Sequence, residues 1–151
     1  GQRHRGIIMN DELDKEIELI QACITRMADN SFKLKELYIS LISLALTVML
    51  SQKCELLIMG MFLMIVTIVF WGLDAFYLQM ETWYRWKYEW VIEKRPMGEK
   101  SNLYDLNPHN KNMWLDIQRK NDCFTKFVFS KTLIPLYGTM AGISIIVLLC
   151  G

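Results

Sequence analysis

The sequence predicts an all-α integral membrane protein with three transmembrane helices and a small helical cytosolic part. Charged residues are absent from three apolar stretches, residues 37–50, 56–73 and 132–150. The lysines and arginines, 17 in all, are also unevenly divided among the segments between these stretches. Because 52% apolar content and a net charge of +1 are equally compatible with a soluble domain, the clustering of the charges carries the prediction.

The distribution of positive charge predicts an orientation. Six lysines and arginines precede the first apolar stretch and ten lie between the second and third, whereas Lys53 alone lies between the first and second. Cytosolic segments of membrane proteins are enriched in these residues. We therefore expect a multi-pass protein of the cell inner membrane, with its amino terminus in the cytosol and its carboxyl terminus outside.

The three stretches differ in how well they match a bilayer, which requires about 20 apolar residues at about 1.5 Å each. The third is long enough, and Pro135 lies in its first turn, where no helical hydrogen bond is lost. The second ends at Asp74. The first is the shortest and requires Lys33 and Lys35 to extend towards the headgroups; a buried helix of a soluble core is the alternative for it. The short connection 51–55 makes the first two stretches an antiparallel hairpin.

Two further helices are expected in the cytosol. From Asp11, apolar residues recur every three or four positions, which indicates an amphipathic helix that leads into the first span after Ser31 and packs on the protein's other cytosolic helices. The second span should continue as one helix to Glu93, with Glu81 and Arg85 spaced to form an ion pair. The predicted parts are thus 1–35 (cytosolic helix), 36–80 (transmembrane hairpin), 81–131 (cytosolic arms and loop) and 132–151 (third span).

The cytosolic arms contain an aromatic run and a second helix start. Asn107 and Pro108 have the residue types of a helix start, and we expect that helix to reach the third span near Lys131. The run of five aromatics is interpreted as an interfacial belt with helix packing. A base-stacking platform is the alternative, although nucleic acid is not an expected partner. The run comprises Trp83, Tyr84, Trp86, Tyr88 and Trp90.

Sequence motifs for catalysis are missing. There is no Cys-x-x-Cys pair, phosphate-binding glycine loop, nucleophile elbow or His-Glu-x-x-His motif, so we predict a protein that is not an enzyme and has no cofactor or metal site. The cysteines divide by compartment, with Cys23 and Cys123 inside and Cys54 and Cys150 outside. In an oxidising exterior the last two could form a disulfide; small apolar packing residues are the alternative.

Two features of the predicted spans suggest a site. Asp74 is ionisable and lies near the cytosolic boundary, where it either pairs with Lys33, Lys35 or Lys131 or lines a wet path. Small residues form two faces at which helices can approach closely, within one subunit or between subunits. These are Gly138 and Gly142 in the third span, and Ser43 and Thr47 in the first.

Two segments also resemble a known group of proteins. The run RMADNSFKLK at 26–35, two close spans and the run FWGLDAFYL at 70–78 are similar to small bacterial multi-span membrane proteins associated with antiphage defence loci. The resemblance covers about the first two thirds of the chain. It implies a membrane effector that oligomerises in the inner membrane, or binds a partner protein through its cytosolic helices, and perturbs the bilayer. A structural anchor for a cytosolic enzyme and a small channel or transporter component are the alternative functions.

Overall fold

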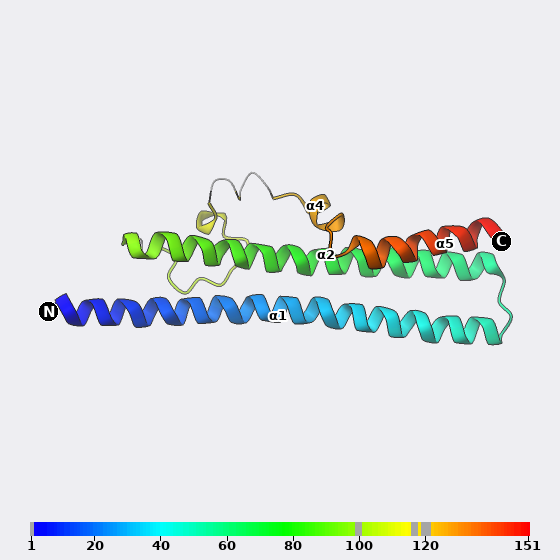
Figure 1. Ribbon diagram of the computed structural model, residues 1–151, viewed down its shortest axis with the longest axis horizontal. Coiled ribbons are helices and arrows are strands. Elements are labelled where there is room, and N and C mark those ends of the chain that lie inside the picture. The colour runs from blue at the N-terminus through cyan, green and yellow to red at the C-terminus, as the bar shows by residue number, and fades with distance from the viewer. Residues whose placement is uncertain (1, 99–100, 116–117, 119–121) are drawn as a thin grey trace. The chain divides into compact units, whose positions relative to one another are not determined.

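The computed structural model describes residues 2–98, 101–115, 118 and 122–151, with side chains from Asp11 onward. Regular structure within these ranges is helical, without strands, which confirms the all-α prediction. Two long helices dominate, and shorter helical segments follow them (Figure 1). In chain order the elements are α1 (Gln2–Ser51), α2 (Leu56–Lys94), the 3₁₀ helices η1 (Arg95–Met97) and η2 (Lys111–Met113), α4 (Phe124–Val128), the π-helix η3 (Ile134–Gly138) and α5 (Thr139–Cys150).

Two helical stretches are long and apolar enough to cross a membrane. They are Asp11–Ser51, within α1, and Leu56–Met97, which includes α2. The carboxyl-terminal stretch Ile134–Cys150 is apolar but shorter. The structure thus supports two candidate spans by length and composition, and the third remains a proposal.

The predicted extent holds for α2, and the helix start predicted at Asn107 is wrong. α2 runs without a break from Leu56 to Lys94, as predicted. α1 leads into the first apolar stretch as one continuous helix that includes Ser31. Asn107 does not start a helix; its side chain closes a turn on the backbone N–H of His109. The cap of η2 is Asn110. Residues 116–117 and 119–121 of the helix predicted towards Lys131 lie outside the described residues; of the others, Gln118 is helical, Asp122 and Cys123 are not, and α4 follows.

The chain divides into two compact units. Unit 1 comprises Gly1–Ala28 and Gln79–Asp122, and unit 2 comprises Asp29–Leu78 and Cys123–Gly151. Each unit therefore takes its residues from two distant parts of the sequence.

Unit 1 has an apolar core between the first part of α1 and the last part of α2. Ile20 packs with Trp90, Val91 and Met113, all of which are buried. The amphipathic face predicted from Asp11 onward therefore packs on helices of the same chain, as expected. Each fully buried side chain of this size contributes about 1.5–3 kcal/mol. Partly buried neighbours from α1 are Leu13, Ile17 and Ile24.

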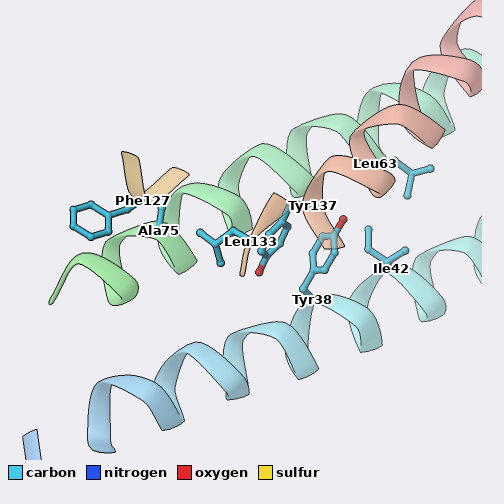
Figure 2. Packing of buried hydrophobic residues seen from close by; sticks show 7 residues of the cluster. All are labelled: Tyr38, Ile42, Leu63, Ala75, Phe127, Leu133 and Tyr137. Carbon is cyan, nitrogen blue, oxygen red and sulfur yellow. The ribbon is translucent and has the colours of Figure 1, made fainter. Parts of the chain in front are cut away.

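Unit 2 has a separate core, to which α1, α2, α4 and η3 contribute side chains (Figure 2). Figure 1 shows α5 running beside the first half of α2. At Gly60 the two helices are so close that an added Cβ would lie 2.8 Å from the side chain of Leu148. The buried cluster consists of Tyr38, Ile42, Leu63, Ala75, Phe127, Leu133 and Tyr137.

Candidate functional site

The carboxylate of Asp74 lies at the centre of a buried polar cluster in unit 2. Its side chain is 0% exposed and its two oxygens receive donors from α1 and η3. The Lys35 ammonium lies 2.6 Å from Oδ2, and the Tyr137 hydroxyl donates to the same oxygen at 2.9 Å. Ser31 Oγ donates to Oδ1 and itself accepts a hydrogen bond from Lys35 Nζ at 2.8 Å. Of the three lysines predicted as partners of Asp74, the structure brings Lys35 to it.

The helical phases explain why these groups meet. Ser31 and Lys35 are four residues apart and so lie on one face of α1. Pro135 lies in the first turn of the π-helix η3, as predicted for the start of this segment, and Tyr137 lies in the same wide turn. π-turns often occur at functional sites, and this one places a tyrosine hydroxyl on the carboxylate.

Aromatic rings enclose the cluster on the apolar side. The rings of Tyr38 and Tyr137 lie 5.2 Å apart between centroids (Figure 2). The ring of Trp71 stacks on that of Tyr137, at 6.2 Å between centroids. The hydroxyl of Tyr38 is hydrogen-bonded to Thr67 at 2.8 Å, and the Trp71 indole donates to the Val128 carbonyl at 2.8 Å. These polar atoms are thus satisfied inside an apolar surrounding, as buried polar groups must be.

The cluster is chemically balanced. One carboxylate faces one ammonium and two hydroxyl donors, so both charges are paired and hydrogen-bonded, which a low-dielectric site requires. Among the described residues, no group of three or more His, Cys, Asp or Glu is placed to hold a metal ion. The arrangement joins three helical segments and holds a charge pair.

The predicted small-residue faces point away from the chain's own helices. A Cβ added at Gly142 would meet no atom within 4 Å, and at Gly138 only a side-chain atom of Ile134 in the same helix, at 3.6 Å. Ser43 and Thr47 are exposed, and the Thr47 hydroxyl donates to the carbonyl of Ser43 at 2.8 Å. Close packing within unit 2 occurs at Gly60 instead. In the sequence, Gly60 is a glycine inside an apolar stretch, but the four-residue spacing of Gly138 and Gly142 was the feature from which close helix contact was predicted.

A second buried ion pair lies in unit 1. The guanidinium of Arg95 binds both carboxylate oxygens of Glu16, each at 3.0 Å, and its Nη1 donates to the Ser101 carbonyl at 2.7 Å. Their side chains are 5% and 1% exposed. The backbone N–H of Tyr104 also approaches Glu16, at 3.4 Å. The pair therefore ties the loop after η1 to α1, and neither Glu16 nor Arg95 was singled out from the sequence.

Lys87 is a further buried cation of unit 1. Its ammonium donates to the carbonyls of Asp105 and Asn107 at 2.5 and 2.7 Å. Burial lowers the pKa of Lys87, while the charge of Asp105 opposes this change. The pKa of Asp105 is lowered, chiefly by the hydrogen bond from the Asn107 backbone and further by Asn110 and Lys87. These contacts fix the loop before η2 on α2.

The aromatic run serves mainly to pack unit 1. Trp83, Tyr84 and Trp90 are buried, and Trp83 and Trp86 each contact the ring of Trp114, at 5.5 and 5.1 Å between centroids. Trp83 is tilted at 36° to the ring of Trp114 and Trp86 meets it edge-on at 74°, so these rings pack inside unit 1 and do not form a stacking platform. A groove of about 440 Å³ lies beside them, lined by Gln21, Ile24 and Thr25 of α1 and Arg85, Tyr88 and Glu89 of α2.

Comparison with protein-family models, curated proteins and solved structures found no match for this chain. The features available for a functional proposal are therefore the cluster around Asp74, the exposed small-residue faces, and the groove and ion pair of unit 1.

Proposed function

We propose that the chain is an integral protein of the bacterial inner membrane that crosses the bilayer three times, with its amino terminus inside and its carboxyl terminus outside. The exposed surface of unit 2 supports this. Leucine and isoleucine side chains of α1, α2 and α5 are exposed, among them Leu44 (65%), Ile65 (63%) and Leu149 (82%). Contiguous apolar surface of this kind requires a partner or lipid.

The position of the carboxyl-terminal helices supports the third span. They begin beside Asp74, through Tyr137, and end beside Leu57, where a Cβ on Gly151 would lie 2.9 Å from the backbone nitrogen. Five π-helical and twelve α-helical residues thus extend along the stretch of α2 from Leu57 to Asp74. If this stretch of α2 crosses the bilayer, η3 and α5 therefore cross it beside α2.

The proposed activity is that of a membrane effector of an antiphage defence system, which oligomerises and perturbs the bilayer. The observation that carries it is the open face of Gly142, where no atom lies within 4 Å of an added Cβ, together with exposed Ser43 and Thr47. In a bilayer, small residues allow close helix contact, and in this chain they are left for a neighbouring subunit. The resemblance at 26–35 and 70–78 supports the defence setting.

Dye release from liposomes tests this activity. Purified protein should release a small dye from vesicles of bacterial lipid, and Gly138→Leu/Gly142→Leu should release several-fold less while inserting to the same extent. Gly72→Leu is the matched control, because Gly72 also has no atom within 4 Å of an added Cβ but lies on α2. No release at any protein density, or equal loss in the control, contradicts the effector proposal.

A structural anchor is the second candidate function. The groove of unit 1 favours it, since its lining combines apolar, amide and charged side chains suited to a protein segment. In this case the protein releases no dye but co-purifies with a cytosolic partner. Thr25→Arg, which fills the groove, should abolish that co-purification, whereas Gly138→Leu/Gly142→Leu should leave it intact.

A channel component is less well supported by the geometry. That function would require Asp74 to face a wet path, but its carboxylate is fully buried and receives three donors in unit 2. These donors occupy most of the roughly four lone-pair sites of the carboxylate, and none of the side chain is exposed to water. We therefore favour a structural role for this residue.

A further inference from the structure

Two cysteines that are distant in the sequence lie at the same end of unit 2. Cys54 precedes the start of α2 at Leu56, and Cys150 is the last residue of α5. A Cβ placed on Gly151 would lie 3.2 Å from the Cβ of Leu56 and 2.9 Å from the backbone nitrogen of Leu57. The residue after Cys150 is therefore in van der Waals contact with residues two and three positions after Cys54.

The backbone fixes one partner and leaves both thiols accessible. Lys53 has a φ of 53°, and the N–H of Cys54 donates to the carbonyl of Met49 at 3.0 Å. This is the pattern of a helix C-cap, so the end of α1 holds Cys54 in place. Both thiols are free; Cys54 is half-buried and Cys150 exposed. Cys150 is one residue from Gly151 and Cys54 is two residues from Leu56, so both cysteines lie within a few residues of this contact. A disulfide between them needs a Cα separation of about 4.4–6.8 Å.

We propose that Cys54 and Cys150 form an intramolecular disulfide on the outer face of the membrane, which joins the end of α5 to the turn between α1 and α2. The proposal rests on the three-span topology, which places both residues outside. Cys23 and Cys123 lie on the reducing side and stay as thiols. The bridge holds together the same two helices that pack closely at Gly60 and Leu148.

The reaction is a thiol–disulfide exchange with a protein disulfide of the oxidising compartment. The thiolate of one cysteine attacks a sulfur of that oxidant and forms a mixed disulfide, releasing one oxidant thiolate. The second cysteine, as thiolate, attacks the sulfur of the first and displaces the other oxidant thiolate. In sum, two thiols of this chain lose two protons and two electrons, and one disulfide of the oxidant becomes two thiols.

Thiol trapping in cells tests the proposal. Cells that express the full chain are quenched with acid, free thiols are blocked with N-ethylmaleimide, and disulfides are then reduced and labelled with a maleimide-linked polymer. We expect two labelled cysteines per chain in a band of monomer mobility without reductant. Cys54→Ser and Cys150→Ser should each abolish both labels, while Cys23→Ser and Cys123→Ser should leave both.

A membrane-impermeant maleimide separates a failure of the bridge from a failure of the topology. It is applied to intact cells that carry Cys54→Ser, in which Cys150 is unpaired. If Cys150 is labelled from outside but the wild type shows no reducible pair, the disulfide is overturned and the topology stands. If Cys150 is labelled only after the cells are opened, the topology fails and the proposal fails with it. A disulfide-linked dimer that persists in Cys54→Ser also overturns the intramolecular bridge.

Discussion

Asp74 links three helical segments through a single carboxylate, and its partners differ in how well they tolerate loss of charge. Ser31 and Tyr137 donate to different oxygens of the carboxylate, so beside an amide one hydroxyl can still donate to the oxygen while the other can turn to accept from the NH2 group. Lys35 loses its counter-ion, but its side chain is 21% exposed and so remains in reach of water. The charge of Asp74 is therefore expected to matter for stability more than for shape.

Asp74→Asn separates these contributions. Hydrogen bonds to charged groups contribute about 1.5–3 kcal/mol, and we expect the substitution to lower unfolding free energy in detergent by roughly that amount. Dye release should survive, because the helices still meet. Lys35→Met/Asp74→Asn should be more stable than Asp74→Asn alone, since no unpaired ammonium is left. Loss of release in an Asp74→Asn protein that inserts and assembles normally would show that the carboxylate serves permeation.

The ion pair between Glu16 and Arg95 offers a sharper test, because both side chains are almost fully buried. Glu16→Leu leaves the guanidinium without its counter-ion and should cost about 3–5 kcal/mol. Glu16→Leu/Arg95→Met should recover at least half of this loss. Near-ultraviolet circular dichroism reports on the change, since Trp83, Trp86, Trp90 and Trp114 all belong to unit 1. Equal destabilisation in the single and double variants would mean that removing the guanidinium relieves no unpaired buried charge.

At the scale of elements, the close contact between α2 and α5 depends on Gly60, which faces Leu148 of α5. An added Cβ at Gly60 meets not only the side chain of Leu148 but also its backbone nitrogen, at 3.1 Å. The side chain can rotate away, whereas the backbone moves only with the helix. Gly142 lies on α5, and a Cβ added there would meet nothing within 4 Å.

Gly60→Ala and Gly142→Ala form a matched pair of variants. Both gain about 1 kcal/mol of helix propensity, but overpacking at Gly60 costs about 1–3 kcal/mol. We expect Gly60→Ala to melt at a lower temperature than the wild type in detergent, and Gly142→Ala at an equal or higher one. A higher melting temperature for Gly60→Ala would mean that α5 does not approach α2 as closely as described.

At the scale of the whole molecule, the distribution of lysine and arginine predicts which ends face the cytosol. A reporter that is active only outside the cytosol should be active when fused after Gly151 and silent when inserted within residues 98–110. Insertion in the connection 51–55 serves as the positive control, because Lys53 is the one cation between the first two apolar stretches. Activity within 98–110 combined with silence after Gly151 would reverse the orientation.

The sequence by itself determined the class of fold and the extent of α2. Both depend on local chemistry: on apolar stretches free of charge and on a run without Gly or Pro as far as Glu93. The ion pair between Glu81 and Arg85 also forms as expected from their spacing, at 2.7 Å. The sequence also indicated Asp74 as an ionisable group near the cytosolic boundary, with Lys33, Lys35 or Lys131 as its partner. The helical repeat fixes the face on which each of these residues lies, but the structure selected Lys35 and buried the carboxylate.

Only the tertiary structure decided which helices meet and where. Glu16 and Arg95 are 79 residues apart, and nothing in their local sequence distinguishes them from other charged residues of exposed helix faces. The same holds for the contact of Gly60 with Leu148, and for the position of Gly151 beside Leu56 and Leu57 at the start of α2. Periodicity fixes the face on which a side chain lies, but the pairing of faces depends on the register between helices. That register is set by the sum of many packing contacts, which no single segment contains.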